Sequence, residues 1–306
     1  MNLFVTGISG LLGLNLAHLA RDRFEVSGCY LNSPVYIAGV ETVELNLIDF
    51  ASTQSALYTI RPDVILHTAA WTDVDSCQSS PERAQLINTE ASRNLAEVAS
   101  SMGAKFVQIS TDQLFKGEAP WKTEEDSPAP INVYGETKWH AEQQVVSMCP
   151  SALILRTNFF GWGTSRRASF SDWILNSLKQ GRELTMFDDV FFTPILINHM
   201  AEVIFKLIER KASGLFHVSG ADRLSKFDFA MRLSEVFGCS SKQIRAGSLA
   251  DVTLKAHRPL DMSLSSKKVE RYLETEMPTV TEGLELLKSL HEYGWPKSLD
   301  FACTGR

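Results

Sequence analysis

Cysteine is scarce in this chain, and its distribution argues against several classes of small protein. The 306 residues include five cysteines, and no two of them form a Cys-x-x-Cys pair. They are Cys29, Cys77, Cys149, Cys239 and Cys303. An odd number of scattered cysteines is typical of reduced thiols and not of a disulfide framework or a zinc site. We therefore expect free thiols and no metal site.

Positive charge and long apolar runs are also lacking. The 30 lysines and arginines are outnumbered by 36 acidic residues, which gives a net charge of −6. Proteins that bind phosphate backbones usually carry a basic patch, so we do not expect nucleic acid as a partner. No apolar run approaches the ~18 residues that cross a bilayer, and the strand-like run Leu3–Val5 is not preceded by a basic leader. We expect a cytoplasmic protein with no membrane partner.

The composition that remains is that of an ordinary globular protein, with 44% hydrophobic and 22% charged residues. The length exceeds that of a usual single core and suggests one large or two closely joined domains. Short apolar runs alternate with segments of helical periodicity. The expected strands are 3–5, 24–30, 43–47, 63–67, 106–109, 152–156 and 215–218, and the expected helices are 14–21, 50–60, 81–102, 134 onward, 170–178, 200–208 and 227–237. This alternation predicts a parallel sheet with right-handed crossovers.

A glycine-rich turn follows the first expected strand. Gly7, Gly10 and Gly13 are spaced three residues apart and lead into a helical segment. Such spacing lets the backbone turn tightly and approach a pyrophosphate, while the helix N-terminus offers free N–H groups to its charge. A plain loop is the alternative. The intervening Ser9, Leu11 and Leu12 are expected to share this cofactor contact.

These patterns predict an α/β fold, a Rossmann doubly wound parallel sheet with a smaller carboxyl-terminal substrate lobe. We expect residues 1–157 and 190–218 to form the NAD(P)-binding domain. Residues 158–189 and 219–306 would then form the substrate-binding lobe. In such sheets ligands bind at the carboxyl ends of the strands.

The end of the second expected strand normally selects the cofactor. An acid there holds the ribose 2′-hydroxyl of NADH and repels the 2′-phosphate of NADPH. The segment 30–33 contains neither an acid nor an arginine, so a modest preference for NADPH is expected and NADH stays possible. Arg21 or Arg23 could reach the phosphate if the loop folds back. Further cofactor contacts are expected from the other strand ends, at Tyr30, Asn32, Asn46, Leu47, Thr68, Ala69 and Ala70.

The central motif pairs Tyr134 with Lys138 at the start of a helical pattern. Residues four apart share a helix face, so the ammonium can lie beside the phenol. Lowering a tyrosine pKa from ~10 by about three units takes roughly 4 kcal/mol, which one cation at about 4 Å supplies. Lys138 is therefore expected to lower the Tyr134 pKa. Tyr293 and Lys297 share the spacing, but a glycine and a proline between them disfavour a helix.

Ser110, Thr111 and Asp112 follow the fifth expected strand, where a ligand of a doubly wound sheet lies. The alternative is that they only cap the strand as turn residues. Gln113 comes next, and Asn132 precedes the helix that carries Tyr134. A hydroxyl and a phenol near one strand end favour general acid chemistry on an oxygen of the substrate.

Four segments in this order resemble an extended short-chain dehydrogenase/reductase, and within it the dTDP-4-dehydrorhamnose reductases. The segments are Thr6-Gly-x-x-Gly-x-x-Gly13, Arg61-Pro-Asp-Val-x-x-x-Thr-Ala-Ala70, Ile109-Ser-Thr-Asp112 and Pro130-x-Asn-Val-Tyr-Gly-x-x-Lys138. The resemblance is dense over residues 1–160 and thinner beyond, where 155–157 and 258–259 still match. It implies NAD(P)H-dependent reduction of the 4-keto group of a nucleotide-activated 6-deoxy sugar, in carbohydrate biosynthesis.

The resemblance also assigns roles to residues. It implies that Thr111, Tyr134 and Lys138 form the catalytic set. The expected substrate contacts are Thr111, Asp112, Gln113, Asn158, Phe159 and Arg258. The expected partner is the nucleotide-sugar substrate, and a homodimer stays possible.

The chain departs from the subgroup on the substrate side. Gln113 stands where the reductases usually have tyrosine, Phe159 stands where they often have tryptophan, and the segment 188–194 is altered. The related 4,6-dehydratases carry an acid at the position of Gln113, so a dehydratase is not expected. Two alternatives remain: a non-catalytic regulatory protein resembling the methionine adenosyltransferase β subunit, which resembles the same reductases, and a sugar-nucleotide epimerase.

Overall fold

A seven-stranded parallel sheet forms the centre of the molecule, and the computed structural model describes residues 1–304 of the chain. The strand order is β11-β6-β5-β4-β1-β2-β3, so the chain reverses its direction of travel across the sheet between β1 and β4. The strands are β1 (Asn2–Thr6), β2 (Glu25–Tyr30), β3 (Glu41–Glu44), β4 (Val64–His67), β5 (Lys105–Ile109), β6 (Leu153–Thr157) and β11 (Gly214–Val218). This order confirms the doubly wound α/β fold, whose ligands bind where the strand order reverses.

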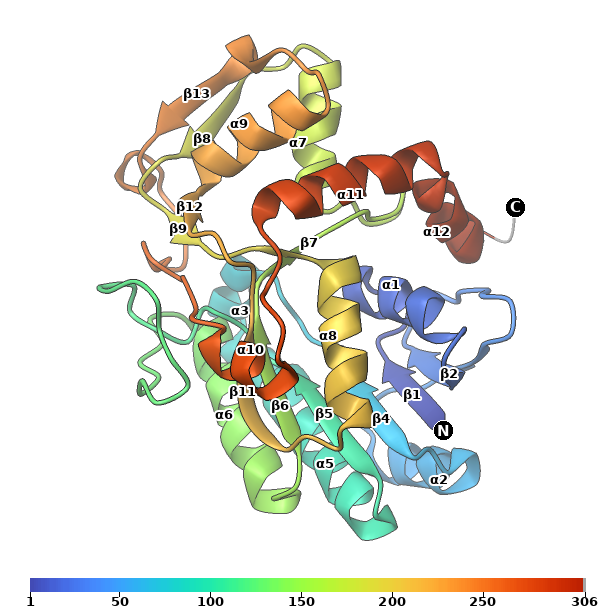
Figure 1. Ribbon diagram of the computed structural model, residues 1–306. Coiled ribbons are helices and arrows are strands. Elements are labelled where there is room, and N and C mark those ends of the chain that lie inside the picture. The colour runs from blue at the N-terminus through green and yellow to red at the C-terminus, as the bar shows by residue number, and fades with distance from the viewer. Residues whose placement is uncertain (305–306) are drawn as a thin grey trace.

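Helices cover both faces of this sheet (Figure 1). The helices of the described chain are α1 (Leu11–Ala20), α2 (Phe50–Ile60), α3 (Val74–Ser79), α4 (Pro81–Gln85), α5 (Ala91–Met102), α6 (Val133–Met148), α7 (Phe170–Lys179), α8 (Ile197–Glu209), α9 (Lys226–Val236), α10 (Lys267–Leu273), α11 (Val280–Glu292) and α12 (Trp295–Thr304), with the short turns η1 (Leu86–Glu90), η2 (Ser241–Gln243) and η3 (Leu249–Asp251). Within residues 1–304, no helix is long and apolar enough to cross a membrane.

Alternate strand residues point into two separate cores, as the two-residue period of a strand requires. In β1, Leu3 and Val5 face the core that includes α1 and α8, whereas Phe4 faces the core under α2, α5 and α6. All three side chains are fully buried. Because both faces are covered, the strands read as continuous apolar runs, which is why the sequence pattern located them.

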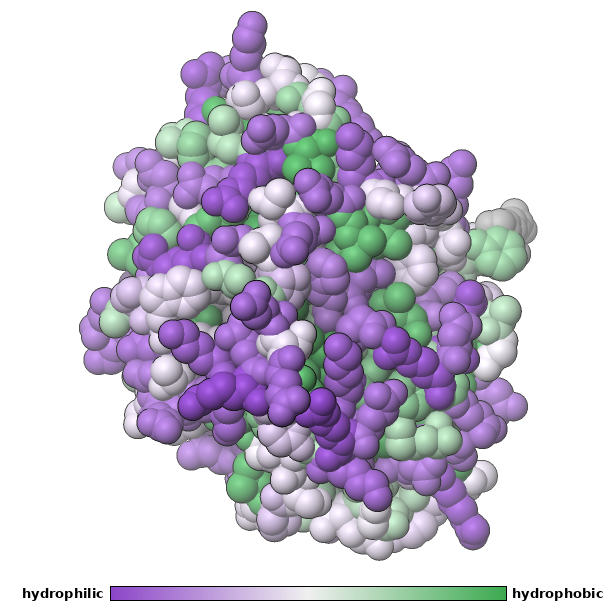
Figure 2. All heavy atoms as spheres, in the orientation of Figure 1, coloured by the Kyte–Doolittle hydropathy of each residue, from purple (hydrophilic) through white to green (hydrophobic). Residues whose placement is uncertain are grey.

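Three small two-stranded sheets lie outside the main sheet. They pair β7 (Phe159–Phe160) with β10 (Ile195–Leu196), β9 (Phe191–Phe192) with β12 (Leu224–Ser225), and β8 (Leu184–Phe187) with β13 (Ile244–Gly247). Figure 1 shows β8, β13, α7 and α9 gathered at the top of the molecule, apart from the large sheet. Figure 2 shows hydrophilic residues over most of the same face, with hydrophobic ones in small scattered groups.

Two sequence predictions of elements need correction. The expected helix over 81–102 is divided into α4, the π-helical turn η1 and α5. The wider turn of η1 lets consecutive side chains face inward: Asn88 accepts from Trp71 N at 2.7 Å, and Thr89 donates to Thr137 O at 2.7 Å. The third strand lies at Glu41–Glu44 and not at 43–47, because its register with β2 ends at the pair Tyr30–Glu44.

Candidate active site

The glycine turn joins β1 to α1 at the point where the strand order reverses. Gly7 has φ +64°, and Gly10 donates its N–H to Gly7 O at 2.8 Å. Gly10 is the N-cap of α1 and offers no side chain to the first helical N–H groups. These N–H groups are therefore available to an anionic ligand, as the phosphates of a dinucleotide require.

Replacing Gly13 by Ala should damage this turn. A Cβ at this position would lie 2.4 Å from Gly7 O and 2.8 Å from Thr68 Oγ1, and Thr68 cannot easily move because it donates to Thr6 O at 2.6 Å. We expect Gly13→Ala to cost about 1–3 kcal/mol of stability and to weaken NADPH binding, measured by thermal unfolding and fluorescence titration. Gly247→Ala is the control, since its Cβ would meet only the Thr185 side chain. Wild-type NADPH affinity in Gly13→Ala would contradict the prediction.

Two cavities open at the carboxyl edge of the sheet on either side of this turn. The first has a volume of about 440 Å³. Of the expected cofactor residues, its lining includes Gly7, Ser9, Gly10, Tyr30, Asn46, Leu47, Thr68, Ala69 and Ala70. Trp71, Arg83, Ile87 and Arg167 also line it, none of which the sequence pattern had indicated.

The second cavity, of about 290 Å³, collects the expected catalytic residues. Of the expected site residues it brings together Gly10, Leu11, Leu12, Gly13, Thr68, Ala70, Thr111, Asp112, Gln113, Tyr134, Lys138, Asn158 and Phe159. These residues come from five separate stretches of the chain. The arrangement fits a dinucleotide that lies across the glycine turn with one half in each cavity.

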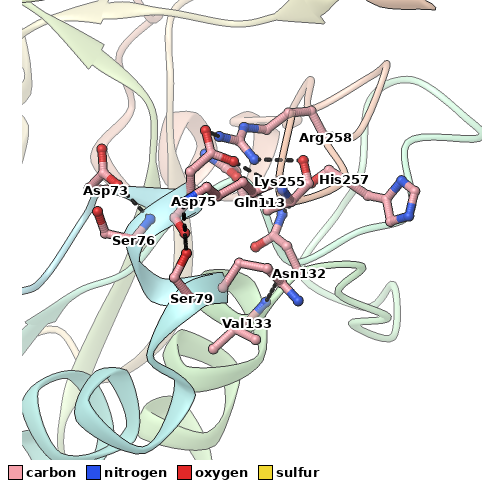
Figure 3. A network of polar contacts seen from close by, with 12 residues as sticks. Asp73, Asp75, Ser76, Ser79, Gln113, Asn132, Val133, Lys255, His257 and Arg258 are labelled. Carbon is pink, nitrogen blue, oxygen red and sulfur yellow. Dashed lines mark hydrogen bonds and ion pairs between the residues drawn. The ribbon is translucent and has the colours of Figure 1, made fainter. Parts of the chain in front are cut away.

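Asn32 and Arg258 lie outside both cavities. Asn32 is exposed in the loop after β2. Figure 3 shows Arg258 directed at Asp75 of α3: its Nη2 lies 3.0 Å from Asp75 Oδ2, and its Nη1 donates to Ala256 O at 2.9 Å. Arg23 is likewise engaged, with its Nη2 2.7 Å from Glu202 Oε2, so its guanidinium does not reach back to the end of β2.

The polar network in Figure 3 also fixes the start of α6. Asn132 is the N-cap and accepts from Gly135 N at 2.8 Å, while its amide donates to His257 O at 3.0 Å. The same amide lies 3.5 Å from Gln113 Oε1. One capping residue therefore joins the helix of Tyr134 to the segment that carries His257.

Tyr134 lies in the first turn of α6 and is buried, and it lines the same cavity as Thr111 and Lys138. Burial raises the pKa of Tyr134 above its usual value, with the Asp112 charge adding to the rise and Thr111 opposing it. The expectation that Lys138 lowers this pKa is wrong for this arrangement, because the Lys138 ammonium turns to Ile109 O at 2.8 Å. Tyr134 therefore stays protonated at neutral pH, the form a proton donor needs.

Lys138 is fully enclosed, and burial lowers its pKa to about 8, although the Glu142 charge opposes the shift. Below this pH the folded protein must bury a charge that the unfolded chain keeps in water. The cost is on the order of 3 kcal/mol. It disappears as the pH rises from about 8 to the unfolded value of 10.5.

Lys138→Met should therefore stabilise the protein at neutral pH. After subtracting about 1 kcal/mol for the lost hydrogen bond to Ile109 O, we expect the melting temperature to rise by about 4 °C. The gain should shrink as the pH approaches 10.5, the ordinary lysine value. Thermal unfolding across pH checks this, with the exposed Lys288→Met as control. If the melting temperature of Lys138→Met fell below that of wild type at neutral pH, the buried Lys138 charge would not be destabilising.

Asp112 carries the second unusual charge of the cavity. It is buried, its Oδ2 accepts from Asn158, and its Oδ1 accepts from Thr111 at 3.2 Å. Burial raises the Asp112 pKa to about 6, with Asn158, the Lys226 charge and Thr111 opposing the rise. Lys226 comes from α9, and its ammonium lies 3.2 Å from the centre of the Phe192 ring. No sequence motif marked Lys226, because its role depends on a contact across more than 100 residues.

The parallel sheet, the glycine turn and the cavity holding Thr111, Tyr134 and Lys138 together define an extended short-chain dehydrogenase/reductase. Within that class, the family model described as RmlD substrate binding domain matches residues 1–292. The chain belongs to this family, which confirms the resemblance seen in the sequence.

Named relatives agree with this assignment. The probable low-salt glycan biosynthesis reductase Agl14 of Haloferax volcanii is 33% identical over 295 residues, which cover 94% of this chain and 98% of that protein. Methionine adenosyltransferase 2 subunit beta of Xenopus laevis is 29% identical over 287 residues, covering 87% and 81%. The structure of dTDP-4-dehydrorhamnose reductase from Bacillus anthracis in complex with NADP superposes with a TM-score of 0.84 at 27% identity, covering 94% of this chain and 98% of that one.

Proposed function

We propose that the protein uses NADPH to reduce the 4-keto group of a nucleotide-activated 6-deoxy sugar. The observation that carries the proposal is the cavity at the carboxyl end of β5 that Thr111, Tyr134 and Lys138 line together. The family and its reductase relatives support the same chemistry. A pure binding module does not need this catalytic set.

Each catalytic residue has a distinct task. When bound, the nicotinamide supplies a hydride. Tyr134 gives its proton to the oxygen of the reacting carbonyl, and its raised pKa keeps that proton available at neutral pH. Thr111 donates a hydrogen bond to the same oxygen and stabilises its developing charge. Lys138 holds the nicotinamide ribose from the floor of the cavity.

The cofactor site favours NADPH over NADH. The glycine turn offers N–H groups to the pyrophosphate, and no carboxylate stands at the end of β2 to repel a 2′-phosphate. The Bacillus anthracis reductase carries NADP, which supports this choice.

The substrate-binding lobe comprises residues 158–189 and 219–306 in this proposal, and residues 1–157 and 190–218 form the cofactor domain. Asp112, Gln113, Asn158 and Phe159 contact the sugar where the two parts meet. Because Gln113 has no acidic group, water elimination is not expected of this site.

The proposal is tested by following the absorbance of NADPH in the presence of dTDP-, GDP-, CDP- and UDP-linked 4-keto-6-deoxy sugars. Oxidation of NADPH with at least one of these sugars is the expected result. Interconversion of sugars without net oxidation would indicate an epimerase. No turnover, combined with stoichiometric copurification of an unrelated protein, would favour a regulatory role like that of the methionine adenosyltransferase β subunit.

A further inference from the structure

Four residues line both cavities of the site: Gly10, Thr68, Ala70 and Arg167. They therefore mark the junction between the two cavities. A dinucleotide that places one half in each cavity must set its central pyrophosphate at this junction. Gly10, Thr68 and Ala70 have small side chains or none. Within residues 1–304, Arg167 is the one charged residue that lines both cavities.

Arg167 does not belong to the sheet but to the loop between β7 and α7. A tight turn holds it there, since Arg167 N donates to Thr164 O and Thr164 N donates to Arg167 O, both at 3.0 Å. Gly163 permits this closeness, because a Cβ at that position would lie 2.3 Å from Arg167 O. The backbone of Arg167 is therefore held in place by the loop itself.

The loop is also anchored to the helix that follows it. Asp172 in the first turn of α7 accepts from Gly163 N at 2.7 Å and from Ser169 N at 2.8 Å through one carboxylate oxygen. Both ends of the segment 163–169 are thus tied to α7. Movement of Arg167 relative to the sheet would require movement of α7 as well.

The guanidinium of Arg167 is largely free to bind an anion. Its Nη2 donates to Thr72 Oγ1 at 3.1 Å, in the loop that follows β4. Among residues 1–304, no carboxylate lies within ion-pair distance of it, whereas Arg23, Arg156 and Arg258 all have one. The donors that remain match the oxygens of a phosphate group, which arginine binds through two parallel hydrogen bonds.

We propose that Arg167 clamps the pyrophosphate of the dinucleotide cofactor and thereby docks the loop 163–169 onto the cofactor domain. The inference rests on the dinucleotide site of the proposed function, but it does not depend on which sugar is reduced. Arg83 lines the first cavity alone, with its guanidinium 4.9 Å from the centre of the Trp71 ring. Its position suits the adenosine half, whereas the shared position of Arg167 suits the pyrophosphate common to NADPH and NADH.

The test compares Arg167→Gln with the neighbouring control Arg166→Gln, both at exposed positions of the same turn. Dissociation constants for NADPH and NADH are measured by fluorescence titration without any sugar. We expect Arg167→Gln to weaken both cofactors by the same factor, roughly tenfold to 100-fold. Arg167→Lys should recover part of this loss, and Arg166→Gln should stay within twofold of wild type. The melting temperature of each variant is also measured, and a value equal to that of wild type shows that the variant is folded.

Unequal or absent effects would overturn the inference. Weakened NADPH with unchanged NADH would assign Arg167 to the 2′-phosphate. Unchanged binding of both, with a raised KM for a nucleotide sugar, would assign it to the phosphates of the substrate. Equal loss of both cofactors in a protein that oxidises NADPH with none of the sugars would refute the proposed reaction and leave the clamp intact. Wild-type protein that binds neither cofactor would refute both.

Discussion

Tyr134→Phe should lower turnover roughly 10²–10⁴-fold while leaving NADPH binding nearly unchanged. The substitution removes the one proton that the phenol offers to the carbonyl oxygen but keeps the buried ring. Tyr134 belongs to α6, whereas the glycine turn is held by its own backbone hydrogen bond from Gly10 N to Gly7 O, so loss of the hydroxyl should not disturb that turn. Single-turnover oxidation of bound NADPH measures the chemical step directly, and fluorescence titration measures cofactor affinity.

Tyr293→Phe is the matched control, because Tyr293 is 87% exposed and lies between α11 and α12. It removes the same hydroxyl from a position without a cavity, and its activity should equal that of wild type. If Tyr134→Phe retained turnover within a few-fold of wild type, another group would have to supply the proton. Asp112, whose pKa burial raises to about 6, would then be the next residue to replace.

The contrast between Tyr134 and Tyr293 shows what the sequence could predict. Both tyrosines stand four residues before a lysine, but Gly294 adopts φ +81° and ends α11 before the second pair can share a helix. Local rules were enough for this distinction, because helix breaking depends on adjacent residues. They were also enough for the strands of the sheet, whose apolar runs reflect burial on both faces.

Local sequence rules could not predict the direction of the Lys138 side chain. Spacing placed it on the same helix face as Tyr134, but its ammonium donates a hydrogen bond to Ile109 O at the end of β5. A helix pattern states which side chains can meet and not which distant carbonyl competes for them. The effect of burial on the Tyr134 pKa was missed for the same reason, since burial is set by packing across the whole cavity.

Arg167, Lys226 and Arg258 show the limit for charged residues. Arg258 was expected at the substrate, but the chain brings Asp75 to within 3.0 Å of it. Arg167, in the loop before α7, lines both cavities, and the charge of Lys226 in α9 acts on Asp112, by contacts that no motif encodes. The adjacent Arg166 and Arg167, in a stretch otherwise without charge, were the available signal. Partners far apart in sequence decide which arginine is free to bind a ligand.

Arg156→Met should destabilise the protein by about 3–5 kcal/mol, which corresponds to a fall in melting temperature of roughly 10 °C. Arg156 in β6 and Glu142 in α6 form an ion pair at 2.7 Å, and their side chains are only 4% and 7% exposed. Arg156 Nε donates to Glu142 Oε1 at 3.0 Å as well. Methionine keeps an unbranched apolar stem but leaves the Glu142 charge buried without its cation.

The matched control is Arg245→Met, which breaks the pair of Arg245 with Glu183 at 2.6 Å on the surface, where the side chains are 62% and 66% exposed. Exposed pairs contribute about 0–1 kcal/mol, so this variant should melt near wild type. Adding Glu142→Gln to Arg156→Met should restore part of the stability, because the amide removes the buried charge.

Turnover should fall together with stability in Arg156→Met, because the Ser110 hydroxyl donates to Glu142 and Ser110 directly precedes Thr111. Equal melting temperatures for Arg156→Met and Arg245→Met would show that the buried pair does not hold α6 against the sheet.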